Sequence, residues 1–321
     1  MIEVKNLVKR YGDYVAVDNL SFTVEKGQIY GFLGPNGAGK STTMNIITGY
    51  MSSSEGTVLI DGHDILDEPE EAKKRIGYLP EIPPLYPEMT VKEYLKFAAD
   101  LKQVPKSEKN KMIDDIMKIA KIDNVQNRLI KNLSKGYKQR VGIAQAIVGY
   151  PEVLILDEPT VGLDPKQIIE IRDLIRKLAK NHTIILSSHI MQEISAVCDH
   201  ILIIAKGRLL ACDTPDNLSR EFAGDNVLDV TVKATPEQLK RALYDIKDIK
   251  EVTYRISEMK EALDVTIKPN EGADLRESIF YACANEGCPI IKMQFKQMSL
   301  EDVFLELTEK AAALDYAEEE E

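Results

Sequence analysis

The sequence predicts an α/β protein with a parallel core sheet, followed by a smaller α+β domain. Three continuous apolar runs, at 153–156, 183–186 and 201–204, have the composition of strands buried on both faces of a parallel sheet. A fourth apolar run, 29–33, leads directly into a glycine-rich turn. After about residue 224 the pattern changes to short alternating strands and amphipathic helices, which indicates a second domain.

An antiparallel layer is expected beside the parallel sheet. Residues 2–4 and 21–24 alternate between apolar and polar types, as strands with one exposed face do. Turn signals follow at 11–13 and 25–27, and the run 57–60 extends the same layer.

Helices are expected between the buried strands. Asp164 followed by Pro165 is an N-cap with proline at the first helical position, which predicts that a helix begins there. The segment 90–132 is charged, mostly helical in pattern and without strand-like runs. We therefore expect a helical subdomain inserted into the core.

The C-terminal third predicts a ferredoxin-like domain. Its expected elements follow the order β-α-β-β-α-β: strands near 228–232, 252–256, 263–267 and 291–295, and helices at 235–246 and 274–285. A short helix is expected at 303–308 before an acidic tail. The expected boundaries are a first domain at 1–222, a linker at 223–226, the ferredoxin-like domain at 227–310 and a disordered tail at 311–321.

Composition narrows the class of protein. The chain has 321 residues, 44% of them hydrophobic, which is enough for two cores. Its net charge of −11 and pI near 5.1 argue against nucleic acid as a partner, because phosphate neutralisation needs a basic face. No long apolar run is present that would span a membrane, so a cytoplasmic protein is expected.

A complete phosphate-binding loop follows the apolar run 29–33. It consists of Gly34, Pro35, Asn36, Gly37, Ala38, Gly39, Lys40, Ser41 and Thr42. Glycines allow backbone N–H groups to turn toward a phosphate chain, Lys40 supplies a positive charge, and the Ser41 hydroxyl is a Mg²⁺ ligand in such loops. A helix is expected at 41–50, with its positive dipole end toward the nucleotide.

Two consecutive acids end the buried run 153–156. Asp157 is expected to hold Mg²⁺ through water, and Glu158 to orient and deprotonate an attacking water. Strand ends are often acidic for solubility alone, so it is the phosphate loop upstream that favours a nucleoside triphosphatase.

With these motifs the chain resembles the ATP-binding cassette family over residues 1 to about 222. The stretch 133–140, Leu-Ser-Lys-Gly-Tyr-Lys-Gln-Arg, resembles the family's signature motif, although Lys135 and Tyr137 depart from its strict form. Ser134 and Gly136 are kept. In the family this motif binds the γ-phosphate of ATP on a second cassette, so the resemblance implies a head-to-tail dimer, either of identical chains or with a close relative.

The resemblance implies three more site residues. His189 matches the switch histidine that contacts the γ-phosphate, and Tyr11 resembles the aromatic residue that stacks on adenine. Glu81 stands where the family usually has a glutamine that reaches Mg²⁺. A carboxylate also ligates Mg²⁺, so an altered metal affinity is expected.

The resemblance also implies a transport role. The ending 298–308 is similar to that of cassette subunits serving ABC-2-type exporters, and 78–97 is similar to the drug-export and gliding-motility branch. Such subunits lie on the cytoplasmic face of the membrane and drive an integral-membrane permease. The alternative is a soluble cassette ATPase acting on nucleic acid or the ribosome. A single cassette without a long heptad insertion or basic arm disfavours it.

Overall fold

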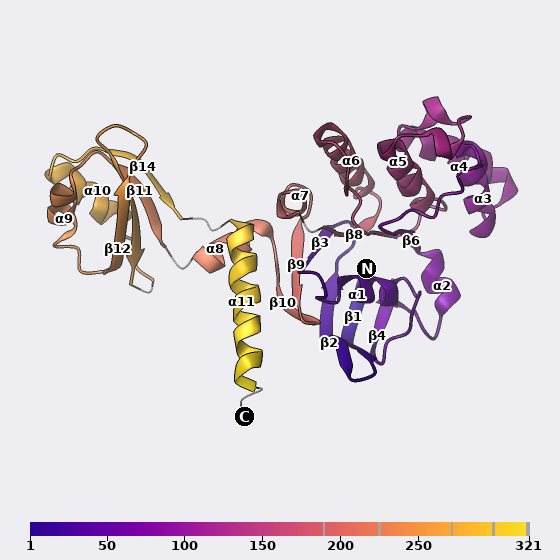
Figure 1. The fold of residues 1–321 in the computed structure, drawn as a ribbon, viewed down its shortest axis with the longest axis horizontal. Coiled ribbons are helices and arrows are strands. Elements are labelled where there is room, and N and C mark those ends of the chain that lie inside the picture. The colour runs from indigo at the N-terminus through magenta and orange to yellow at the C-terminus, as the bar shows by residue number, and fades with distance from the viewer. Residues whose placement is uncertain (189, 224–225, 271, 297–298, 319–321) are drawn as a thin grey trace. The chain divides into compact units, whose positions relative to one another are not determined.

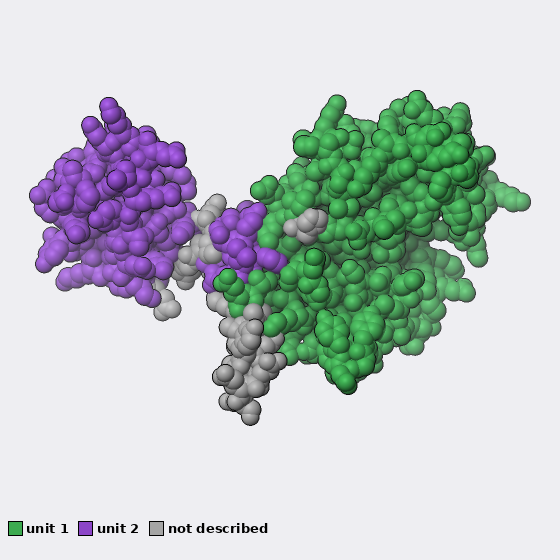
Figure 2. Space-filling view, viewed as in Figure 1, with its two compact units in different colours: residues 1–215, 307–321 green, residues 216–306 purple. Residues whose placement is uncertain are grey.

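The computed structural model of the chain describes residues 1–188, 190–223, 226–270, 272–296 and 299–318. They form two compact units, one of residues 1–215 with 307–321 and the other of residues 216–306 (Figure 2). None of the described helices is long and apolar enough to cross a membrane.

A six-stranded sheet forms the centre of the first unit (Figure 1). Its strand order is β10 (Arg208–Asp213), β9 (His200–Ala205), β3 (Ile29–Leu33), β8 (Thr183–Ser187), β7 (Val153–Leu156) and β6 (Ile76–Leu79). The five strands from β9 to β6 are parallel, and β10 is antiparallel at the edge. Every residue of β3, β7 and β8 is buried, as their uninterrupted apolar sequences predict.

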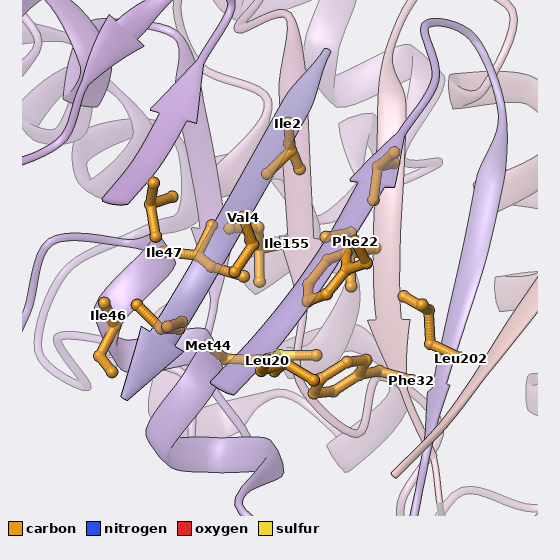
Figure 3. Packing of buried hydrophobic residues seen from close by; sticks show 14 of the residues in the cluster. Ile2, Val4, Leu20, Phe22, Phe32, Met44, Ile46, Ile47, Ile155 and Leu202 are labelled. Carbon is orange, nitrogen blue, oxygen red and sulfur yellow. The ribbon is translucent and has the colours of Figure 1, made fainter. Parts of the chain in front are cut away.

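A four-stranded antiparallel sheet packs over one face of this core. Its order is β2 (Tyr14–Val24), β1 (Ile2–Tyr11), β4 (Glu55–Ile60) and β5 (His63–Asp64). Alternate residues of β1 and β2, including Ile2, Val4, Leu20 and Phe22, point into a shared hydrophobic core (Figure 3). Phe32 of β3 meets Phe22 there, with ring centroids 5.8 Å apart, so the core joins the two sheets.

Helices connect the strands of the first unit. They are α1 (Lys40–Ile47), α2 (Pro69–Lys74), α3 (Val91–Leu101), α4 (Lys106–Ile119), α5 (Lys135–Ala146), α6 (Pro165–Leu178) and α7 (Met191–Ser195), with short 3-10 turns at Asp123–Val125 and Ile130–Asn132. A further helix, α8 (Pro215–Ala223), belongs to the second unit except for its first residue. The segment predicted to be a helical subdomain contains α3 and α4, which contact α5. Thr90 begins α3 through a capping box with Glu93, in which each residue satisfies the other's backbone N–H.

The second unit contains a four-stranded antiparallel sheet of order β12 (Ile249–Ile256), β13 (Leu263–Pro269), β11 (Leu228–Val232) and β14 (Ile290–Phe295). Two helices, α9 (Pro236–Leu243) and α10 (Arg276–Asn285), contribute to its hydrophobic core. The order β-α-β-β-α-β with this strand arrangement is ferredoxin-like. The predicted fold class is therefore confirmed.

Four helices differ in length from their predictions. The helices expected at 235–246 and 274–285 are shorter, at Pro236–Leu243 and Arg276–Asn285. The helix expected at 41–50 spans Lys40–Ile47, because Gly49 has a φ of +67° and cannot continue it. The helix expected at 303–308 lies within α11 (Leu300–Glu318). The alanine-rich sequence at 311–313 consists of strong helix formers, which accounts for the extension beyond 308.

Candidate functional site

A pocket of about 390 Å³ opens at the carboxyl ends of β3 and β7. Ligands of open parallel sheets bind at these strand ends, where loops leave the sheet. The pocket is lined by Tyr11, Tyr14, Ala16, Asn36, Gly37, Gly39, Lys40, Ser41, Thr42, Glu81, Asp157, Glu158 and Val161. It thus gathers predicted site residues from four separate segments of the chain.

The glycines of the phosphate loop allow a close approach of backbone to backbone. Gly34 is buried, and a Cβ atom there would lie 2.5 Å from the Ile204 carbonyl oxygen of β9. Gly39 adopts a φ of +96° immediately before α1, and a Cβ atom on it would lie 2.5 Å from the Ala16 carbonyl oxygen. Gly34 and Ala38 are buried and Pro35 is exposed, and none of the three lines the pocket.

Lys40 lies between the loop and the acids. Its Nζ donates hydrogen bonds to the carbonyl oxygens of Gly34, at 2.5 Å, and Pro35, at 3.0 Å. Burial lowers the pKa of Lys40, while the nearby carboxylates of Glu158 and Asp157 act in the opposite direction. The Lys40 ammonium is therefore partly removed from water, and the two carboxylates favour its charged form. A charged ammonium is the form that binds phosphate.

The two acids at the end of β7 are fixed by the adjacent strand. Ser187, the last residue of β8 and 1% exposed, donates its hydroxyl to Asp157 Oδ1 and accepts a hydrogen bond from the Glu158 backbone N–H at 3.0 Å. Glu158 has a φ of +48°, a left-handed conformation that non-glycine residues hold only when their surroundings require it. The turn that carries both carboxylates is thus tied to β8.

Tyr11 and Glu81 come to the pocket from separate strands of the fold, β1 and β6. Tyr11 ends β1, is 47% exposed, and donates its hydroxyl to Met51 Sδ at 3.2 Å. Lys9 Nζ lies 5.4 Å from the centroid of the Tyr11 ring. Glu81 lies two residues beyond β6 and is exposed.

Ser134 and Gly136 line a different pocket, of about 340 Å³, together with Tyr137, Arg140, Gln167 and other residues. Ser134 caps α5, where the Tyr137 backbone N–H meets its hydroxyl at 3.5 Å. A Cβ atom on Gly136 would lie 2.7 Å from the end of the Gln167 side chain, which would have to move to make room. Among the residues described, the signature motif therefore does not contribute to the lining of the phosphate-loop pocket.

One predicted site residue, His189, lies outside the described residues. Four residues around the pocket were not predicted from the sequence: Tyr14, Ala16, Val161 and Ser187. A signal existed for Ser187 alone, because a polar residue at the carboxyl end of a buried parallel strand is a site candidate.

A phosphate loop at the end of one parallel strand, with paired acids at the end of another, defines a P-loop nucleoside triphosphatase. The antiparallel sheet and the separate capped motif at Ser134 narrow this class to ATP-binding cassettes.

Comparison with known proteins agrees with this class. The family described as ABC transporter matches residues 17–161. The chain is 32% identical over 309 residues to the linearmycin resistance ATP-binding protein LnrL of Bacillus subtilis, covering 96% of this chain and 98% of that protein. It is 35% identical over 309 residues to the bacitracin transport ATP-binding protein BcrA of Bacillus licheniformis, covering 96% and 97%. The chain belongs to the ABC transporter ATP-binding protein family.

Solved structures support the same assignment. An ATP-binding subunit of an ABC transporter matches with a TM-score of 0.63 and 33% identity, over 69% of this chain and 93% of that one. The cassette MJ0796, a dimer in a post-hydrolysis state with ADP and Pi, matches with a TM-score of 0.60 and 27% identity, over 67% and 98%. The chain is an ATP-hydrolysing transporter subunit, and these similarities support transport over the nucleic-acid or ribosome alternative. Cassettes of this family dimerise and act with a membrane permease.

Proposed function

We propose that this chain hydrolyses ATP at a site shared by two cassettes and thereby drives an exporter. The observation that carries the proposal is the division of the predicted residues between two pockets. The phosphate loop and the acids line one pocket, whereas Ser134 and Gly136 line another. A head-to-tail dimer brings the second pocket of one chain over the first pocket of its partner, as the family resemblance implies.

Residues of the two cassettes together supply the groups for the hydrolytic step. Lys40 and the backbone N–H groups of the loop bind the phosphates, and Tyr11 stacks on the base. The Glu158 carboxylate accepts a proton from water as the water oxygen bonds to the γ-phosphorus. The bond from phosphorus to the bridging oxygen breaks, which releases ADP. In this scheme His189 binds the γ-phosphate from the same chain, and Ser134 and Gly136 bind it from the second cassette.

The donors in the pocket fit Mg²⁺. The Ser41 hydroxyl and the carboxylates of Glu81 and Asp157 supply oxygen ligands, which this ion prefers. The hydrogen bond from Ser187 orients one oxygen of Asp157. Bound Mg²⁺ would neutralise charge on the β- and γ-phosphates.

The exporter assignment goes beyond the family. Relatives whose names state a role in transport, resistance or export are BcrA, LnrL and a Nod factor export ATP-binding protein of Burkholderia lata, 35% identical over 230 residues. Together with the resemblance at 298–308, these similarities favour an ABC-2-type permease as the partner. The chain would then lie on the cytoplasmic face of the membrane.

The permease contact is proposed at the loop after Glu81. Ile82 is 83% exposed, and Tyr86 is half exposed with its ring packed against Phe97, at a centroid distance of 5.3 Å. Exposed apolar side chains on a loop fit a binding surface for another protein. The ferredoxin-like domain, which has its own core, is proposed to hold the two cassettes together while the nucleotide sites open.

Purification from solubilised membranes tests the proposal. The chain should retain a polytopic membrane protein, and Ile82→Asp should release it without loss of ATP binding. Ile256→Asp is the matched control, because Ile256 is equally exposed, at 87%, in the second unit. Co-purification of ribosomes or DNA in place of a membrane protein would contradict the transport assignment.

A further inference from the structure

A buried carboxyl lies behind the hydrolytic turn. Glu193, on α7, is 5% exposed, and its Oε2 accepts hydrogen bonds from the hydroxyls of Thr160 and Ser188. These hydroxyls come from two different segments, one after β7 and the other after β8. Both are also buried, with Thr160 6% and Ser188 1% exposed.

The position of Glu193 needs an explanation, because a carboxyl group away from water is costly unless hydrogen bonds satisfy it. Within the described part of the chain, the structure records no ion pair between Glu193 and a basic side chain. The two hydroxyls are its recorded side-chain partners. Hydroxyl-to-carboxylate bonds are roughly twice as strong as neutral ones. The Ser188 hydroxyl is 3.4 Å from Glu193 Oε2, so the closer contact with Thr160 is the stronger of the two.

The helix that carries Glu193 is seated on the core sheet. Ile194 packs over Gly31 of β3 so closely that a Cβ atom on Gly31 would lie 2.5 Å from Ile194 Cγ2. The Cys198 backbone N–H bonds to the Ile194 carbonyl oxygen at 2.9 Å. Glu193 is therefore a fixed point relative to the strand that leads into the phosphate loop.

The hydroxyl of Thr160 completes a clamp on the turn. The first end of the turn is held by Ser187, which binds Asp157 and the Glu158 backbone N–H. The far end is held where Thr160, two residues beyond Glu158, meets Glu193. Between these anchors Glu158 keeps its left-handed backbone, a conformation of higher energy that relaxes when its supports are removed.

We propose that Glu193 is a positioning residue for hydrolysis, which acts through Thr160 to fix the backbone that aims Glu158 at the attacking water. This inference rests on the proposed role of Glu158 as the base. It assigns Glu193 no contact with ATP. Instead, the Glu193 carboxyl joins the turn after β7 to the segment after β8. The positions of these two segments relative to each other are thereby fixed.

The test compares Thr160→Val with Thr160→Ser in the full chain. Valine keeps the shape of threonine but removes the hydroxyl, whereas serine keeps the hydroxyl. We expect Thr160→Val to lower kcat by about 10- to 100-fold, the scale of a small misplacement of a catalytic group, with the Kd for ATP within about twofold. Thr160→Ser should stay within about twofold of the native kcat, and Glu193→Ala should behave like Thr160→Val.

Three results would overturn the inference. The first is a Thr160→Val variant with native kcat. The second is a loss of ATP affinity that parallels the loss of kcat and that serine does not rescue, which would mean that the contact only stabilises the fold. The third is near-native turnover by a Glu158→Gln variant that is measured beside the Thr160 variants. That result would instead show that the proposed base is wrong, whatever the Thr160 variants do.

Discussion

Gly39→Ala tests how tightly the phosphate loop is built. Two costs follow from the structure. Alanine at the Gly39 φ of +96° is strained, and its methyl carbon would lie 2.5 Å from the Ala16 carbonyl oxygen. Gly37→Ala is the matched control, because Gly37 has a φ of +81° with no atom within 4 Å of an added Cβ.

Comparing the two variants separates the cost of backbone strain from the cost of steric overlap with Ala16. Left-handed backbone costs an alanine about 1–2 kcal/mol, which both variants bear. Forced overlap in a packed site costs about 1–3 kcal/mol more, which only Gly39→Ala bears. We expect Gly39→Ala to reduce the free energy of unfolding by at least about 1 kcal/mol more than Gly37→Ala.

Calorimetry measures this difference. The unfolding transition of the cassette is identified as the one whose Tm rises when ATP is added, because ATP binds only the folded cassette. For a unit of this size, each kcal/mol shifts Tm by about 2–4 °C, so Gly39→Ala should melt at least about 2 °C below Gly37→Ala. Equal Tm values for the two variants would refute the argument that contact with Ala16 restricts the loop.

Three further predictions concern the nucleotide and the second unit. Lys40→Ala should lose ATP binding, measured with a fluorescent analogue, because it removes the charge that meets phosphate; retained tight binding would contradict its assignment. Glu81→Gln should remain active but need more Mg²⁺ for half-maximal ATPase, since an amide is a weaker ligand than a carboxylate. An unchanged Mg²⁺ dependence would mean that Glu81 does not reach the metal. A chain that ends at Ala223 should bind ATP but dimerise more weakly, seen as a steeper dependence of ATPase rate on protein concentration. Identical dependence for both chains would dismiss a dimerising role for the residues beyond 223.

Features encoded within one segment could be predicted from the sequence. The loop at 34–42 is recognisable because its glycines, lysine and hydroxyls act through the local backbone, and β3 before it is a continuous apolar run. Asp164 capped α6 as expected, with its side chain accepting from the Gln167 N–H at 2.9 Å. In each case the physical cause lies within a few residues.

Features that depend on neighbouring segments could not be predicted. The bonds of Ser187 to the acids exist because β8 pairs with β7, and no local pattern encodes that adjacency. The contact of Thr160 with Glu193 joins positions 33 residues apart. The full length of β1 could not be predicted either. Its pairing with β2 contains register shifts between Val4 and Arg10, which break the alternation of apolar and polar residues.

The central claim is that Glu158 is the base for ATP hydrolysis at a site shared by two cassettes. Its most direct test is Glu158→Gln, with turnover and molecular mass measured together in ATP and Mg²⁺. The amide keeps the shape of the carboxylate but cannot accept the proton from water, so turnover should fall by about 10²–10⁴-fold while ATP still binds. The variant should then accumulate as a nucleotide-bound dimer. A variant that keeps near-native turnover, or that stays monomeric with ATP bound, would contradict the claim.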